Sequence, residues 1–263
     1  MLATGKMGTG QSKTKHWEEQ TVDVPYEPRG DGYRVWLFGD SILDNSYWNG
    51  VKADTTLERL RPLLPGVEVR DRAGECADAL TMAHCLERGA RYHVAPHYVA
   101  HRNALGLPYD GAPEGALDLD PEFGGGDFLV LSVGGNDFAL RGETDPAAIL
   151  EQVRRVLRHY KARGVKPERM LYITPYPPTH LMRLGMALRG QNLDALYARM
   201  VAEAGEMCRE EGAACLALDF FGSDEKACDG SLIPEPTRYG AWKLAKLIQE
   251  FVLPQIQREE SVG

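Results

Sequence analysis

The chain has 263 residues, of which 43% are hydrophobic and 26% are charged, and its formal net charge is −8. This length suits one α/β domain, and the composition is that of an ordinary soluble globular protein. An excess of negative charge repels phosphate backbones, so no nucleic-acid partner is expected. No apolar run approaches the roughly 18 residues of a membrane-spanning helix, so no transmembrane segment is expected.

The N-terminus and the cysteines indicate where the protein works. Residues 1–30 are polar and lack the apolar core of a secretory signal, so we expect a flexible leader followed by a single domain over 31–263. The five cysteines are widely spaced and contain no Cys-x-x-Cys pair. This pattern favours reduced thiols in a cytoplasmic protein without a zinc cluster. Nothing in the sequence indicates a cofactor or an oligomeric state.

Apolar runs of strand length alternate with amphipathic runs of helix length along the N-terminal half. We predict strands at Arg34–Phe38, Val67–Arg70 and Phe128–Val133, and helices at Thr55–Leu64 and Ala77–Arg88. Asp54 is the expected N-cap of the first of these helices.

The C-terminal half continues the alternation. We predict helices at Asp145–Arg163, Leu193–Glu211 and Tyr239–Val252, and strands at Met170–Thr174 and Ala214–Leu218. Strands that alternate with helices are typical of an α/β protein whose five strands form a parallel sheet with right-handed crossovers.

One segment, residues 89–126, is too long for an ordinary connection. Its second half is acidic and rich in Gly and Pro, so we expect an irregular flap inserted into the domain, as lids and binding loops often are. His93, His97 and His101 are spaced four residues apart, as metal ligands on a helix can be. Because Pro96 interrupts such a helix, no metal site is predicted there.

Three short motifs follow three of the predicted strands, and the carboxyl ends of parallel strands share one edge of the sheet. Gly39-Asp40-Ser41 follows the first strand, where a serine can expose its hydroxyl beside backbone N–H groups. Gly74 follows the second, and its N–H can approach an oxyanion without obstruction. Asn136, in Gly-Gly-Asn-Asp after the third, offers an amide donor.

In this order the motifs resemble the SGNH, or GDSL-type, hydrolases, and the likeness covers about residues 33–250. The resemblance implies a flavodoxin-like three-layer sandwich with five parallel strands. It also implies a serine-dependent hydrolase or acyltransferase acting on a small-molecule or acyl ester. Ser41 is then the nucleophile, and its own N–H, the Gly74 N–H and the Asn136 amide form the oxyanion hole.

The last block departs from the family pattern Asp-x-x-His-Pro. Glu235 stands at the position of the histidine, Leu232 at that of the aspartate, and the chain has no histidine beyond His180. Ile-Glu-Pro-Ser in a subset of GDSL-like proteins is similar to Pro-Glu-Pro-Thr here. Three explanations are open: Glu235 is the base, with a pKa raised by burial; His180 supplies the base; or the protein binds a ligand without hydrolysing it.

Three further acids lie beside these motifs. Asp40, Asp44 and Asp137 are expected to border the substrate, the last two by hydrogen bonding to nearby backbone. The sequence therefore predicts an ester hydrolase with an unusual base. Its alternatives are a non-catalytic SGNH-like binding module and a non-hydrolytic reaction on the same scaffold.

Overall fold

Five parallel strands form the main sheet of the protein. A computed structural model of the chain describes residues 32–178, 183, 192–219 and 236–262. The strands are β1 (Arg34–Gly39), β2 (Glu68–Ala73), β5 (Asp127–Ser132), β6 (Met170–Ile173) and β7 (Ala214–Leu216), in the spatial order β2-β1-β5-β6-β7. The predicted five-stranded parallel sheet is therefore confirmed.

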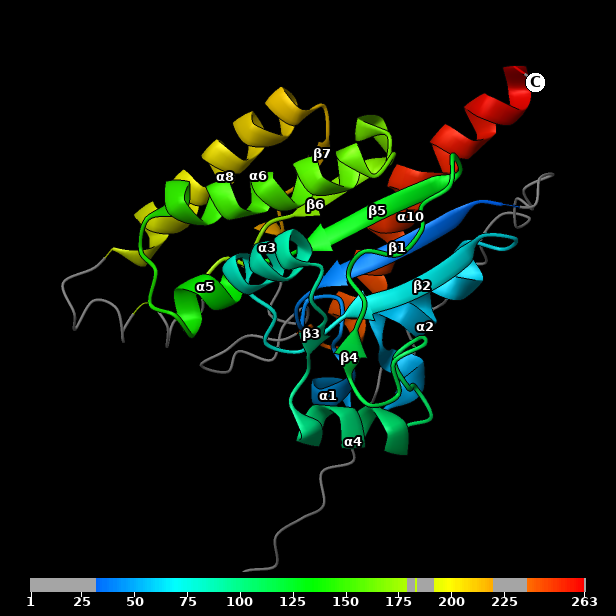
Figure 1. The fold of residues 1–263 in the computed structure, drawn as a ribbon, viewed down its shortest axis with the longest axis horizontal. Coiled ribbons are helices and arrows are strands. Elements are labelled where there is room, and N and C mark those ends of the chain that lie inside the picture. The colour runs from blue at the N-terminus through cyan, green and yellow to red at the C-terminus, as the bar shows by residue number, and fades with distance from the viewer. Residues whose placement is uncertain (1–31, 179–182, 184–191, 220–235, 263) are drawn as a thin grey trace, which may run out of the picture.

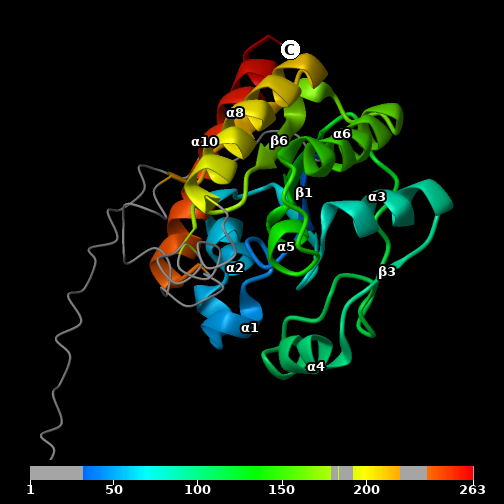
Figure 2. The same ribbon diagram turned by 90° about the vertical axis from the view of Figure 1, so that its left-hand side faces the viewer.

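Helices cover both faces of this sheet. The helices α3 (Ala79–Arg88), α6 (Pro146–Ala162) and α8 (Leu193–Glu211) pack side by side on one face, and α2 (Thr56–Leu60) and α10 (Arg238–Val262) pack on the other (Figures 1 and 2). The result is a three-layer α/β sandwich whose strand order is that of the flavodoxin-like folds.

The alternation of side chains along β1 explains the two layers of core. Trp36 and Phe38 point into the cluster with α3, α6 and α8, whereas Val35 and Leu37 point into the cluster with α2 and α10. All four are almost completely buried. Burial of each such side chain stabilises the fold by roughly 1.5–3 kcal/mol, so an apolar strand of this kind belongs in the interior of the sheet and not at its edge.

Two helix ends differ from the sequence-based prediction. Thr55, not Asp54, caps α2, because its hydroxyl accepts the Glu58 N–H at 3.2 Å. The Asp54 carboxylate instead pairs with Arg59 and Arg238. Helix α10 continues past the predicted end at Val252, through Pro254, to Val262.

Several short elements were not predicted because each is too short for a periodic pattern. They are α1 (Ser46–Asn49), α4 (Pro96–Ala104), α5 (Gly135–Ala139), β3 (Tyr92–His93), β4 (Ala116–Leu117) and the 3-10 turns Lys52–Asp54, Arg61–Leu63 and Pro167–Arg169. No helix among the described residues is long and apolar enough to cross a membrane.

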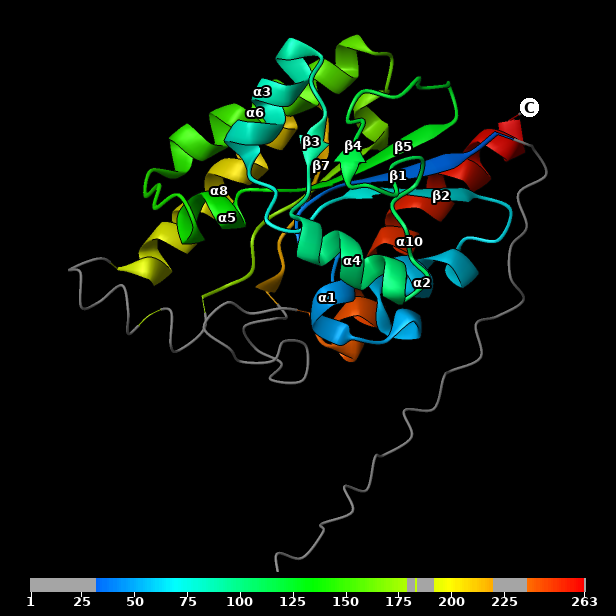
Figure 3. The ribbon, with the colours of Figure 1, turned by 60° about the horizontal axis from the view of Figure 1, so that its bottom comes forward.

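Residues 89–126, predicted as an irregular flap, are irregular only in part and pack onto the domain. The segment contains α4 and the antiparallel pair β3–β4, and Figure 3 shows α4 beside α1. Its side chains Val94, Tyr109 and Leu117 are buried in the same core cluster as Trp36. Apolar residues scattered through an acidic, Gly- and Pro-rich run thus fix the segment onto the domain.

Pro96 also has a different role from the predicted one. It occupies the first turn of α4, where its missing N–H costs nothing, so the helix begins there instead of being interrupted. His97 and His101 lie on α4 and both rings contact Tyr47, while His93 belongs to β3. Among the described residues, no group of histidine, cysteine or acidic side chains is arranged to hold a metal ion.

Gly39 provides a test of how tightly the centre of the sheet is built. Its φ is +139°, and a Cβ at this position would lie 1.9 Å from the backbone oxygen of Ser132. Gly39→Ala should destabilise the protein by about 4 kcal/mol or more, because neither backbone can move without breaking the sheet.

Gly32→Ala is the matched control, since Gly32 has a φ of +131° with no atom within 4 Å of the added Cβ. Gly32→Ala should lower the free energy of unfolding only by the cost of the backbone strain, about 1–3 kcal/mol. Urea denaturation of both variants measures the difference. Equal losses would show that the close approach at Ser132 does not matter.

Candidate active site

The predicted motifs come together at one edge of the sheet. β1 and β5 are neighbours, and the chain leaves β1 toward β2 on one side and returns through β5 on the other, so the strand order reverses between them. The arrowheads of both strands point to the edge where α5 lies (Figure 1). In open parallel sheets this reversal opens a crevice beyond the strand ends, which is where ligands bind.

Ser41 lies in the tight turn that follows β1. The Asp40 carbonyl accepts the N–H groups of Leu43 and Asp44 at 3.1 and 3.0 Å, and this closes the turn. Ser41 is 8% exposed and lines the cleft. No described residue takes a hydrogen bond from its N–H or its hydroxyl. Both groups are therefore available to a molecule in the cleft.

Asn136 lies across the cleft, at the start of α5. Its Nδ2 donates to the Ala77 carbonyl at 2.9 Å, which leaves the second amide hydrogen unused by any described residue. Asn136 lines the same cleft as Ser41. The bond to Ala77 fixes the amide, so its free hydrogen has a defined direction.

The structure gives Gly74 a different role from the predicted one. Its N–H donates to the Gly39 carbonyl at 2.7 Å, and Gly74 is not among the residues that line the cleft. A Cβ here would lie 2.9 Å from Val94 and 3.1 Å from both Leu117 and Tyr92. Gly74 is therefore required by the packing of residues 89–126, and its N–H is occupied by the sheet.

Cys76, two residues after Gly74, has a strained backbone. Cys76 has a φ of +62° and is the single non-glycine residue with positive φ in the described ranges. Its thiol lies 3.6 Å from the Tyr98 hydroxyl on α4. Strained backbone persists only where its surroundings hold it, so the loop after β2 is held partly by α4.

Asp40 is the acid that lies in the cleft itself. One carboxylate oxygen accepts the Ile42 N–H and the Ser132 hydroxyl, both at 3.1 Å, and the residue is 2% exposed. Burial raises the pKa of Asp40 to about 7, although these two hydrogen bonds oppose the shift. Asp40 thus changes charge near neutral pH, directly beside Ser41.

Asp44 and Asp137, which were predicted to border the substrate, do not line the cleft. The Asp137 carboxylate accepts the Ala79 N–H at 2.8 Å and so holds the start of α3 against the Asn136 loop. Burial raises the pKa of Asp137 as well. Asp44 is buried in an ion pair with Arg102. Both acids support the loops that carry the site.

The cleft beside Ser41 has mostly apolar walls. It is lined by Asp40, Ser41, Ile42, Gly135, Asn136, Phe138, Ala139, Pro175, Tyr176, Pro178, Leu193, Leu196 and Tyr197. The hydroxyl of Tyr197, one of the lining residues, donates to the Asp219 carboxylate at 3.2 Å.

The residues of this apolar wall were not predicted from the sequence. Leu193, Leu196 and Tyr197 belong to the start of α8, which comes after β6 in the chain. A helix that begins near the carboxyl ends of the strands turns its first residues toward the crevice there. The position of these residues at the start of α8 could therefore have identified them as lining the cleft. Phe138 follows the Asn136-Asp137 pair and could have been found in the same way.

The two candidate bases lie outside the described residues. His180 and Glu235 fall in 179–182 and 220–235 respectively, and Leu232 falls in the second of these ranges. Thr237 is described, and its hydroxyl accepts the Gly240 N–H at 3.2 Å at the start of α10.

Comparison with known proteins supports the assignment of the fold. No protein-family model matches the chain, and no curated protein matches it in sequence. Solved structures do match. TesA is 16% identical, with a TM-score of 0.52, and the match covers 84% of this chain and 98% of TesA.

Two other solved structures give the same result. A member of the lipolytic G-D-S-L family from Veillonella parvula is 12% identical, with a TM-score of 0.52 and coverage of 85% of this chain and 99% of that protein. The acetyl xylan esterase AlAXEase is 13% identical, with a TM-score of 0.53 and coverage of 84% and 100%. The strand order, the place of Ser41 and Asn136 at the reversal of that order, and these matches together show that the chain has the SGNH hydrolase fold.

Proposed function

We propose that the protein is a serine-dependent ester hydrolase with Ser41 as the nucleophile. The observation that carries this proposal is the pairing of an unoccupied serine hydroxyl and N–H with the free amide hydrogen of Asn136 in one cleft. A nucleophile beside donors that are already fixed in place is the arrangement that acyl transfer needs.

The chemistry follows from these groups. The Ser41 hydroxyl attacks the carbonyl carbon of the ester and passes its proton to a base. The negative charge that develops on the carbonyl oxygen is stabilised by the Ser41 N–H and the Asn136 amide. The protonated base then gives its proton to the leaving alcohol, and water hydrolyses the acyl-enzyme by the same steps. We leave Gly74 out of the oxyanion hole because its N–H is bonded to Gly39.

Glu235 and His180 are the two candidates for the base. A glutamate has an ordinary pKa near 4.3 and needs a raised pKa to accept a serine proton near neutral pH, whereas a histidine does not. The mostly apolar cleft is a suitable place for such a shift.

The nucleophile and the two candidate bases can be tested together. Ser41→Ala should lower kcat for a short p-nitrophenyl ester by about 10³-fold or more, with an unchanged melting temperature. Of Glu235→Gln and His180→Ala, the variant that removes the base should lower kcat and abolish the fall in rate at acid pH.

Rate–pH profiles of the four proteins provide the measurement. Full activity in Ser41→Ala would reject the serine mechanism. If the parent shows no rate above that of Ser41→Ala toward several esters, a non-catalytic binding module becomes the better account, since Glu235 replaces the family's histidine.

The apolar wall indicates the class of ester. We propose that the acyl group lies against Leu193, Leu196 and Phe138, because these side chains line the cleft beside Ser41. Each methylene buried there is worth about 0.8 kcal/mol, or roughly four-fold in kcat/KM. The value of kcat/KM should therefore rise from acetate to hexanoate esters.

Leu196→Asp should reduce that preference about ten-fold, because it places a charge in the wall. Leu140→Asp is the control, since Leu140 is 56% exposed and does not line the cleft. The ratio of kcat/KM for hexanoate and acetate esters is the quantity to measure. An equal change in both variants would place the acyl group elsewhere.

Asp40 makes the folding stability of the protein depend on pH. The unfolded chain releases this proton near pH 3.8, whereas folded Asp40 keeps it to about pH 7. Between these values the folded state binds more protons, so the stability that this residue contributes is lost as the pH rises through 7. Asp40→Asn carries no such charge, so its free energy of unfolding should exceed that of the parent by a margin that grows from near zero at about pH 4 to about 2–4 kcal/mol at about pH 7 and above.

Urea denaturation of the parent and Asp40→Asn across this range measures the difference. Asp71, whose pKa is also raised, is present in both proteins and cancels in the comparison, whereas Asp137 interacts with Asp40 and forms part of the effect that is measured. Parallel stability curves would show that Asp40 is ionised throughout the range.

A further inference from the structure

Residues 89–126 contribute a buried cation, Arg102, beside the turn that carries Ser41. Arg102, in the last turn of α4, is 2% exposed. A guanidinium is rarely buried to this extent unless several partners compensate for the loss of hydration.

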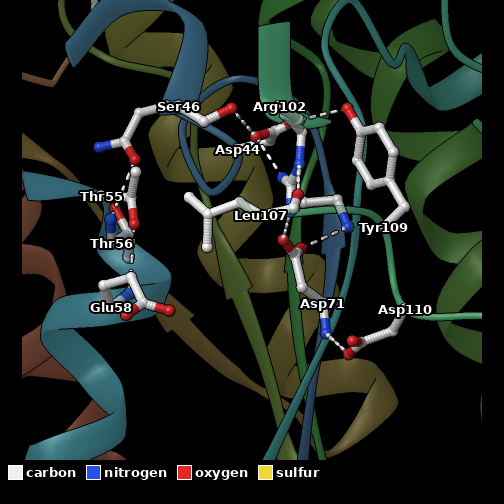
Figure 4. Close-up of polar contacts among 12 residues, drawn as sticks. Asp44, Ser46, Thr55, Thr56, Glu58, Asp71, Arg102, Leu107, Tyr109 and Asp110 are labelled. Carbon is white, nitrogen blue, oxygen red and sulfur yellow. Dashed lines mark hydrogen bonds and ion pairs between the residues drawn. The ribbon is translucent and has the colours of Figure 1, made fainter. Parts of the chain in front are cut away.

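Arg102 has a partner on every side. Its Nη1 lies 2.5 Å from Asp44, its Nη2 lies 2.7 Å from Asp71, and its Nε donates to the Leu107 carbonyl at 2.9 Å. The guanidinium also stacks over the Tyr109 ring, 4.1 Å from its centroid. Figure 4 shows the guanidinium between the two carboxylates.

One carboxylate comes from the turn after β1 and the other from the neighbouring strand β2. Asp44 is three residues after Ser41, and its N–H donates to the Asp40 carbonyl, so it belongs to the same turn as the nucleophile. Asp71 lies in β2, three residues before Gly74. One guanidinium therefore connects the Ser41 turn to the strand that leads into the second loop.

Each carboxylate is fixed by further bonds. Asp44 accepts the Tyr109 hydroxyl at 2.6 Å and the Ser46 hydroxyl at 2.8 Å. Asp71 accepts the Ala73 N–H at 3.0 Å, and its own N–H donates to Asp110 at 3.1 Å. Arg102, Tyr109 and Asp110 all belong to residues 89–126, so this segment is bonded both to the turn after β1 and to β2. It is therefore not free to open as a lid.

We propose that Arg102 is a positioning residue that holds the Ser41 turn in its reactive geometry through Asp44 and Asp71. The proposal rests on the proposed function of Ser41 but concerns a residue that does not touch the substrate. A buried ion pair contributes little to net stability compared with an apolar replacement, so the fixed direction of its bonds is the property that such a pair provides. Residues 89–126 are then part of the catalytic scaffold.

Arg102→Met and Arg169→Met form the matched pair of variants. Arg169 is also 2% exposed and also paired, with Glu259 and the Gly125 carbonyl, but it lies at the amino end of β6, away from the cleft. Arg102→Met should lower kcat about 10²-fold with KM changed less than about three-fold, because displacement of a nucleophile by about 1 Å has an effect of this size. Arg169→Met should keep kcat, even where its melting temperature falls by the same amount.

Hydrogen exchange provides a readout that does not depend on activity. The Leu43 and Asp44 amides, both bonded to the Asp40 carbonyl, should exchange at least about ten-fold faster in Arg102→Met and not in Arg169→Met. Should the parent prove inactive while this exchange result holds, the proposed function fails and the positioning of the turn by Arg102 stands.

Milder variants cover the case in which Arg102→Met does not fold. Tyr109→Phe removes only the 2.6 Å bond to Asp44 and should lower kcat less, with the same constancy of KM. Arg102→Lys retains the charge and should restore part of kcat, since an ammonium group cannot bond both carboxylates as a planar guanidinium does. Unchanged kcat and unchanged exchange in Arg102→Met, or in Tyr109→Phe when the former does not fold, would overturn the proposal.

Discussion

The backbone at the end of β1 is the constraint on which the site depends. The Asp40 N–H donates to the Ser132 carbonyl of β5, and the Gly39 carbonyl accepts the Gly74 N–H that follows β2. Two adjacent residues thus bond β1 to both of its neighbouring strands at the edge where the strand order reverses. Because Gly39 lacks a side chain, the β1 and β5 backbones can approach closely there. Ser41 leaves the sheet immediately beyond this point, so its position is set by the sheet itself.

Charge is the second organising feature of this edge. Asp40, Asp44, Asp71 and Asp137 are all almost completely buried around the cleft, and each is compensated differently. Backbone N–H groups satisfy Asp137 and part of Asp40, whereas Arg102 forms ion pairs with both Asp44 and Asp71. Burial leaves the pKa values of Asp40, Asp71 and Asp137 raised. The rim is therefore held together by groups that were costly to bury, which is typical of a site that requires fixed geometry.

Much of the fold could be predicted from the sequence because its main elements are periodic. The buried strand that begins at Arg34 and the helix Leu193–Glu211 follow from local patterns of apolar residues, and the alternation of such elements implies a parallel sheet. The position of Ser41 and Asn136 at one edge follows from the same topology. Matches to SGNH-type structures agree with this reading at the level of the fold.

Interactions between distant residues could not be predicted in this way. Arg102 is separated by 58 residues from Asp44 and by 31 from Asp71, and no local pattern marks such pairs. The ordered packing of Tyr109 and Leu117 was hidden because their neighbours are acidic and rich in Gly and Pro. Gly74 was given an oxyanion role by resemblance, whereas the crowding by Val94 and the bond to Gly39 appear only in three dimensions.

The most direct test of the central claim is covalent labelling by a fluorophosphonate, followed by intact mass and peptide mapping. The account predicts one adduct per chain on the peptide that contains Ser41, and no adduct in Ser41→Ala. The reaction should occur between about pH 5 and about pH 9 and should not depend on the choice of ester. The absence of an adduct throughout this range, or an adduct on another residue, would contradict the assignment of Ser41 as the nucleophile.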